Sequence, residues 1–152
     1  MSKSKKSPKR KINPKVKKEP RTSPQNLPES TYHRRPAWKL GLIDFAGPWN
    51  CEKIDSKECL LRIHNALKDF ENKTWAEIND RKNNHPMPVH QLSREAKKRL
   101  TEINLDEYDT LYRLTISNKE RLWGILDQEY LSIVWWDPNH TVYMGMPGTV
   151  FI

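Results

Sequence analysis

The sequence predicts an α+β fold in which two helices pack on one face of a small, mainly antiparallel four-stranded sheet, in the order β-α-α-β-β-β. Three observations lead to this prediction. Residues 109–143 hold three short apolar runs separated by polar connections, which is typical of an antiparallel meander. Two stretches with helical apolar spacing precede them. Residues 1–36 lack the apolar side chains needed for a core, so we expect a disordered basic tail at 1–36 and an α+β domain at 37–152.

The positive charge of the chain is concentrated in this tail. Residues 1–36 hold 12 Lys or Arg against 2 acids, whereas the remaining 116 residues hold 15 against 17, so the tail is +10 and the domain −2. A Lys-, Ser- and Pro-rich segment of this kind can follow phosphate backbones, act as a nuclear-import patch in a eukaryotic host, or only keep the chain soluble. The sequence leaves these alternatives open.

Bulk features exclude several classes of protein. The chain has two cysteines, Cys51 and Cys59, which are too few for a disulfide framework or a zinc quartet and suit a reducing compartment. It shows neither a hydrophobic signal region nor an apolar run of about 18 residues. We therefore expect a cytoplasmic protein without a membrane partner.

The first half of the domain should supply one strand and one helix. Residues 38–45 read as a strand ended by Gly47-Pro48. Asp55 stands three residues before Glu58, which predicts a capping box with Asp55 as the N-cap. Apolar residues then recur at helical spacing, namely Cys59, Leu60, Ile63, Ala66, Leu67 and Phe70.

A polar loop and a second helix follow. The loop over residues 79–92 contains His85 and His90, whose spacing does not indicate a metal site, although loop histidines can join an active site. Ser93 should cap a helix with a buried stripe of Ala96, Leu100 and Ile103. The other face carries Arg94, Lys97, Lys98 and Arg99, the best phosphate-facing surface in the domain, so we assign RNA binding to Arg94, Lys97, Lys98, His85 and His90.

Alternation defines the faces of the three final strands. In the first, Tyr112, Leu114 and Ile116 should share one face, with Leu111, Arg113 and Thr115 on the other. The third, residues 130–136, is almost continuously apolar and should lie centrally. Because strand neighbours alternate, one of Trp135 and Trp136 should face away from the two helices and offer an exposed indole for binding.

Hairpin register decides whether two strand arginines can act together. A two-residue loop at 118–119 would place Arg113 and Arg121 on opposite faces of the sheet. A three-residue loop at 118–120 would pair Ser117 with Arg121 and bring both arginines onto one face.

The segments Tyr112–Leu114, Arg121–Ile125 and Trp135–Tyr143, together with the element order, resemble the RelE/ParE/HigB superfamily of bacterial toxins. The resemblance covers residues 38–143 and implies a RelE-like fold. Members are mostly endoribonucleases that cut messenger RNA on the ribosome, or gyrase poisons in the ParE branch, and each is held inactive by a cognate antitoxin. The implied partners are therefore an antitoxin, mRNA and the ribosome.

RNA cleavage without a metal or other cofactor requires proton transfer and stabilisation of a phosphorane. Histidine suits the first task, because its pKa lies near neutrality, and arginine the second, because its fork matches phosphate oxygens. We therefore name His140 as the candidate acid or base and Arg113 and Arg121 as charge stabilisers. Tyr143 would position the phosphate or stack on a base. His85, His90 and Lys98 are reserve candidates.

The leading hypothesis is thus a type II toxin that acts as a metal-independent endoribonuclease. One alternative is a ParE-like inhibitor that acts by protein contact, for example on gyrase. Another is a nucleic-acid-binding accessory protein that acts through its basic tail.

Overall fold

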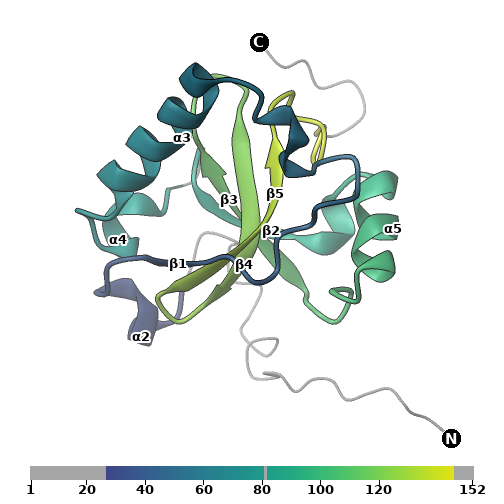
Figure 1. Cartoon of the computed structure of the whole chain (residues 1–152). Helices are drawn as coiled ribbons and strands as arrows, with labels where there is room; N and C mark the ends of the chain where they lie inside the picture. The colour runs from purple at the N-terminus through teal and green to yellow at the C-terminus, as the bar shows by residue number, and fades with distance from the viewer. Residues whose placement is uncertain (1–26, 81, 146–152) are drawn as a thin grey trace, which may run out of the picture.

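A computed structural model describes residues 27–80 and 82–145 of the chain (Figure 1). The helices are α2 (Glu29–Tyr32), α3 (Lys57–Phe70), α4 (Trp75–Ile78) and α5 (Arg94–Glu102), with 3-10 turns η1 (Cys51–Lys53) and η2 (Val89–Gln91). The strands are β1 (Ala37–Lys39), β2 (His85–Pro88), β3 (Thr110–Thr115), β4 (Arg121–Asp127) and β5 (Tyr130–Asp137). They form one sheet in the order β1-β5-β4-β3-β2, in which β1 runs parallel to β5 and the other neighbours are antiparallel.

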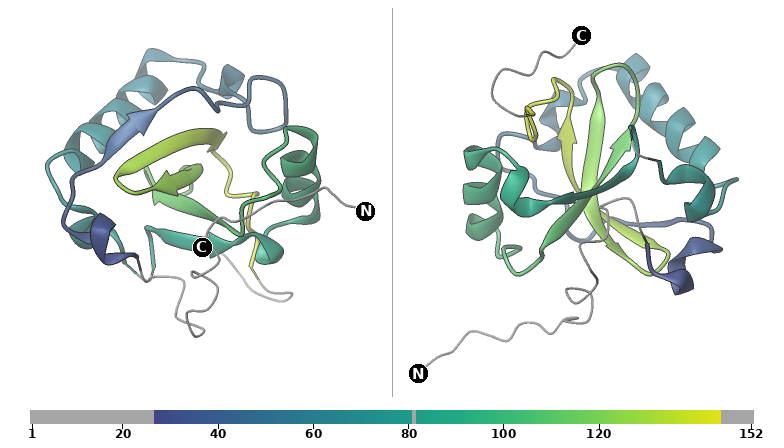
Figure 2. Two further views of the ribbon diagram at one scale, coloured as in Figure 1. Left: turned by 90° about the horizontal axis from the view of Figure 1, so that it is seen from below. Right: turned by 180° about the vertical axis from the view of Figure 1, so that it is seen from behind.

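The predicted placement of both long helices on one face is wrong. Helix α3 lies on one side of the sheet and α5 on the other, which gives three layers (Figure 2). The α5-side core contains Ala96 and Leu100 of α5, whereas the α3-side core contains Ile63 and Phe70 of α3. Adjacent apolar strand residues cause this arrangement, because each neighbouring pair gives one side chain to each face and both faces must be covered.

The sheet also has one strand more than predicted. The segment His85–Pro88, which we expected in a loop, pairs with β3 as the edge strand β2. Its two prolines hide it from sequence analysis, since proline cannot donate to a ladder and is tolerated at edges. The predicted first strand, in contrast, is shorter than 38–45: β1 ends at Lys39, and residues 40–50 form a connection across the α5-side core.

The predicted starts of helix α3 and of the folded domain also differ from those in the structure. Ser56, not Asp55, caps α3 by accepting a hydrogen bond from the backbone N–H of Cys59 (3.1 Å). Residues 27–36, assigned to the tail, belong to the fold: α2 lies there and Thr31 is buried. The part of the predicted tail at 1–26 lies outside the described residues.

Several predictions about the final strands are confirmed. The residues Tyr112, Leu114 and Ile116 face the α3-side core, while Leu111 faces the α5-side core. Ser93 caps α5 through the backbone N–H of Ala96. Strand β5 lies inside the sheet, but neither of its adjacent indoles is exposed: Trp135 and Trp136 are buried in opposite cores, because each face has its own cover. In the described part of the chain, no helix is long and apolar enough to cross a membrane.

Candidate functional site

The β3–β4 hairpin places Arg113 and Arg121 on the same face of the sheet. Thr115 pairs with Arg121 and Arg113 pairs with Trp123, so the register is neither of the two that we considered. The backbone N–H of Ile116 bonds the carbonyl of Glu120 (2.9 Å), which leaves residues 117–119 as the loop. Both arginines therefore point to the α5 side, as a joint site requires.

Both arginine side chains are buried without a carboxylate partner. Arg113 is 7% exposed and Arg121 is 9% exposed. One Nη of Arg113 donates to the carbonyl of Lys82 (2.8 Å), and one Nη of Arg121 donates to the carbonyls of Ser117, Asn118 and Glu120. The Nε of each has no hydrogen-bond partner, and no Asp or Glu within 27–80 or 82–145 forms an ion pair with either.

Their electrostatics follow from this burial. Burial first, and then the neighbouring charge of Arg121, lowers the pKa of Arg113 to about 10. Burial likewise lowers the pKa of Arg121, which the carboxylate of Asp137 partly opposes. Two guanidinium groups that repel each other inside a protein form a site that an anion would stabilise.

A histidine lies on each side of these arginines. His85 is directly opposite Arg113 in the β2–β3 ladder, and its Nε2 lies 3.1 Å from a guanidinium nitrogen of Arg113. Its Nδ1 lies 2.9 Å from the carbonyl of Pro86, so the neutral tautomer donates to that carbonyl and accepts from Arg113. His140 is half-buried after β5. Burial first, and then the charges of nearby arginines, lowers the pKa of both histidines, which favours neutral imidazoles.

Asp137 holds the turn that carries His140. Its carboxylate accepts hydrogen bonds from the backbone N–H groups of Thr141 (2.9 Å) and Val142 (3.0 Å) and from the indole of Trp123 (3.2 Å). His140 itself has a φ of 61°, in the left-handed region that Asn, Asp and His adopt more readily than most residues. The buried carboxylate therefore fixes this turn against β4 and sets where His140 stands.

The remaining predicted residues divide into two groups. Tyr143 packs against the α5-side core and is close enough to Arg113 to raise its pKa. The RNA-binding candidates Arg94, Lys97, Lys98 and His90 are exposed, unlike the two buried arginines. The fourth cation of α5, Arg99, is not free to bind a phosphate, because it makes two 2.8 Å hydrogen bonds to the carboxylate of Asp44.

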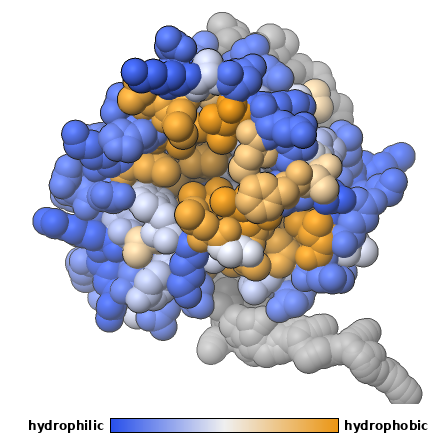
Figure 3. All heavy atoms as spheres, viewed as in Figure 1, coloured by the Kyte–Doolittle hydropathy of each residue, from blue (hydrophilic) through white to orange (hydrophobic). Residues whose placement is uncertain are grey.

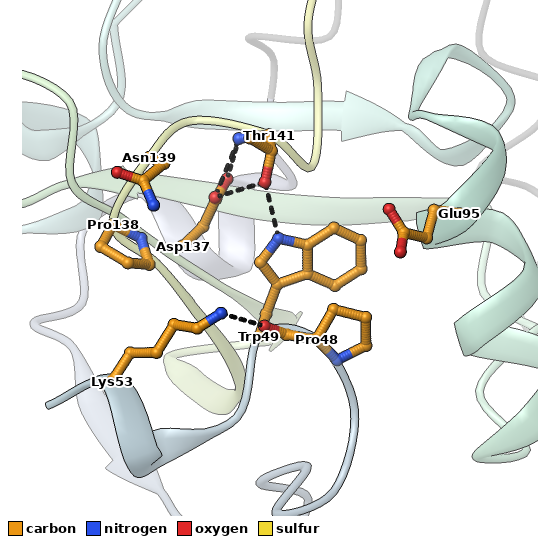
Figure 4. Close-up of a pocket in the computed structure, with 8 residues that line it drawn as sticks. All are labelled: Pro48, Trp49, Lys53, Glu95, Asp137, Pro138, Asn139 and Thr141. Atoms are coloured by element: carbon orange, nitrogen blue, oxygen red, sulfur yellow. Dashed lines mark hydrogen bonds between the residues drawn. The ribbon is translucent and has the colours of Figure 1, made fainter.

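A small pocket opens beside the turn of Asp137 (Figure 4). Pro48 and Pro138 supply apolar walls, and the buried indole of Trp49 donates to the hydroxyl of Thr141 (2.8 Å). The polar groups around it include Lys53, Glu95 and Asn139. Since Asp137 lines this pocket and is also the cross-strand partner of Arg121, the pocket and the arginines are neighbours.

This arrangement suits binding of a phosphate group and proton transfer by a neutral imidazole. Arg113 and Arg121 offer cationic donors in a desolvated setting, where charge-assisted hydrogen bonds are strongest. Within the described ranges, no group of three or more His, Cys, Asp or Glu residues is placed to hold a metal ion.

Comparisons with protein-family models, curated proteins and solved structures found no match to this chain.

Sequence reasoning missed two contributions to the site. His85 was assigned to a loop, and its pairing with Arg113 depends on the unpredicted strand β2. Asp137 received no role, although an Asp at the end of a strand and before Pro-Asn is a known signal for a side chain that bonds the following backbone. That signal alone would have identified the turn but not its contact with Trp123.

Proposed function

We propose that this protein is a RelE-like toxin that cleaves RNA at a site formed by Arg113, Arg121 and His140. The observation that carries the proposal is a pair of neighbouring arginines, 7% and 9% exposed, with no carboxylate partner among the described residues. A buried charge of this kind is costly unless a ligand compensates it. The phosphodiester of RNA is an anion with the geometry that guanidinium groups recognise.

The reaction would proceed without a metal. The ribose 2′-hydroxyl attacks the adjacent phosphorus, and a neutral imidazole accepts its proton, for which we name His140. Arg113 and Arg121 stabilise the extra negative charge on the phosphorane oxygens. The bond between phosphorus and the 5′-oxygen then breaks, which leaves a 2′,3′-cyclic phosphate, and solvent water supplies the proton that the departing 5′-oxygen takes up. His85 keeps Arg113 in place, since its Nε2 already accepts from that guanidinium.

A toxin also requires a protein partner that silences it, and the surface offers a place for one. Apolar side chains gather on the face shown in Figure 3. In the connection after β1, Leu40 is 63% exposed and Phe45 is 72% exposed, and α3 adds Leu60 at 56%. Large exposed apolar groups mark protein contact sites, so we assign this patch to the antitoxin.

The same patch also supports the second candidate function, inhibition of a target protein by contact as in the ParE branch. The two functions make opposite predictions. An endoribonuclease depends on the buried arginines and His140, whereas a contact inhibitor depends on Phe45 and its exposed apolar neighbours. Substitution of each group therefore separates them.

The test is induced expression in bacteria with sequencing of RNA 5′ ends. Wild type should arrest growth and produce new 5′ ends. His140→Ala and Arg121→Met should each reduce cleavage by roughly 10²–10³-fold. The matched controls are His64→Ala and Arg34→Met, which change an exposed histidine and an exposed arginine far from the site in the sequence.

Three results would change the proposal. Arrest without new 5′ ends, together with loss of arrest in Phe45→Glu, would favour the contact inhibitor. Equal cleavage by wild type and Arg121→Met would show that Arg121 takes no part in the reaction, which would contradict the two-arginine site. Absence of arrest with wild type at a verified level of folded protein would contradict the toxin function.

A further inference from the structure

The pocket beside the turn of Asp137 lies next to the proposed phosphate site and differs from it in charge. The arginine side is cationic, whereas the pocket is mixed: the carboxylates of Glu95 and Asp137 and the amide of Asn139 line it between Pro48 and Pro138 (Figure 4). The one ammonium among its lining residues, that of Lys53, donates to the carbonyl of Pro48 (3.2 Å). A nucleotide has the complementary division, with an anionic phosphate at one end and a neutral planar base at the other.

We infer that this pocket binds the nucleobase next to the phosphate held by Arg113 and Arg121, and that Glu95 selects bases with an exocyclic amino group. This inference rests on the proposed function and adds a base subsite to it. Glu95 and Asn139 come from different elements, α5 and the turn after β5, and Figure 4 shows them on opposite sides of Trp49.

The chemistry of Glu95 sets the preference. An ionised carboxylate only accepts hydrogen bonds, so it favours a base that donates from an amino group. Adenine, cytosine and guanine carry such a group, whereas uracil has two carbonyl oxygens and no amino group. The side-chain amide of Asn139 both donates and accepts, so it can contact any base and does not decide the preference.

Buried residues hold the walls of the pocket in place. Trp49 is 4% exposed, and its indole is tied to Thr141, whose hydroxyl in turn contacts Asp137. The floor of the pocket is therefore fixed to the turn that carries His140. The N-terminus of α5 is fixed to the same turn, because the backbone N–H of Ser93 donates to the carbonyl of Val142 (2.8 Å). The backbone at the start of α5, from which Glu95 projects, is therefore held against the turn that carries His140.

The test measures binding of inorganic phosphate and of AMP, CMP and UMP to the full-length protein by calorimetry and NMR shifts. AMP and CMP should bind about tenfold more tightly than UMP, the effect of one charge-assisted hydrogen bond. Glu95→Gln should reduce this ratio to about twofold or less without changing the affinity for inorganic phosphate. Glu107→Gln, an exposed carboxylate beyond α5, is the matched control.

The outcomes separate the two proposals. If phosphate binds and Arg121→Met abolishes its binding, but AMP, CMP and UMP bind equally, the base subsite is overturned and the phosphate site stands. If wild type binds phosphate no better than Arg121→Met does, the proposed function is overturned. A preference for AMP and CMP that survives Glu95→Gln would also overturn the role of Glu95.

Discussion

Two arrangements of positive charge occur on the same side of the sheet, a half-buried one and a buried one, and they differ in how the charge is compensated. Arg99 of α5 meets Asp44 in a two-pronged ion pair, to which the indole of Trp135 adds a hydrogen bond (2.9 Å). Arg113 and Arg121 lie deeper and form no ion pair: their hydrogen bonds go to backbone carbonyls and to His85, and Asp137 acts on Arg121 only through its charge.

The difference separates a contact with a clear structural role from the arginine pair to which the proposed function is assigned. In the Asp44–Arg99 pair, the hydrogen bonds from Arg99 lower the pKa of Asp44, and those to Asp44 and Glu102 raise that of Arg99, so each partner stabilises the charged form of the other. For Arg113 and Arg121 burial lowers the pKa of both. Charge left without compensation inside a fold indicates a ligand site, because it brings no stability of its own.

The largest expected effect on stability comes from breaking the compensated pair. Asp44→Ala leaves Arg99, Trp135 and two backbone N–H groups without their acceptor. Loss of one partner of a buried pair costs about 3–5 kcal/mol, so this variant should lose that much of its free energy of unfolding. Urea denaturation measures it, and a loss below about 1 kcal/mol would show that the pair has no structural role.

The uncompensated pair should respond in the opposite way. Arg121→Met should change the free energy of unfolding by no more than about 1 kcal/mol, because a desolvation cost disappears with the charge. Wild type should instead gain stability from phosphate, by about 2.7 kcal/mol when phosphate is at one hundred times its dissociation constant. Denaturation with and without phosphate checks both statements. A phosphate effect of equal size in Arg121→Met would place the anion elsewhere.

A glycine offers a second way to disturb the compensated pair. A Cβ at Gly47 would press on Nε of Arg99 and lie 2.7 Å from Oδ2 of Asp44. We expect Gly47→Ala to cost about 1–3 kcal/mol, as overpacking does. Gly41→Ala, where no atom lies within 4 Å, is the control. If both variants unfold at the same urea concentration, the contact with Arg99 is not tight in solution.

The smallest expected effect is a difference between Asp44 and His140 in the pH range over which each contributes to the free energy of unfolding. The folded-state pKa of Asp44 is below its ordinary value of 3.8, so its stabilisation is present above that pH and is lost as the pH falls below it. The folded-state pKa of His140 is below 6.5, so the fold favours the neutral ring and loses stability as the pH falls through 6.5. His140→Asn should reduce only the loss near pH 6, and Asp44→Asn only the loss below about pH 4. Denaturation midpoints across pH measure both, and identical profiles would contradict the assignment.

The elements themselves were largely predictable from the chain. Apolar spacing identified both long helices and the three final strands, and Ser93 was recognised as the cap of α5. Strand β2 was missed because two of its four residues are prolines, which argue against a strand unless its edge position is known. The capping residue of α3 was misplaced by one position, since Asp55 and Ser56 are both good caps and only the backbone angles decide.

The candidate site was predictable in its chemistry but not in its assembly. His140, Arg113, Arg121 and Tyr143 were named from residue type and position along the strands. Their meeting depended on the β3–β4 register, which a loop of different length would have changed. The partner of Arg113, His85, came from a segment 28 residues away in the sequence, and no local pattern links the two.

The sequence by itself determined the two long helices and the three final strands, because apolar periodicity and capping act over a few residues. The tertiary structure decided which face each helix covers, which residues lie across from each other, and which buried arginine finds a carboxylate. These depend on pairings between distant segments: Asp44 forms an ion pair with Arg99 across 55 positions, whereas no acid of the described chain forms an ion pair with Arg113 or Arg121. The distinction between a structural arginine and a functional one therefore exists only in the folded protein.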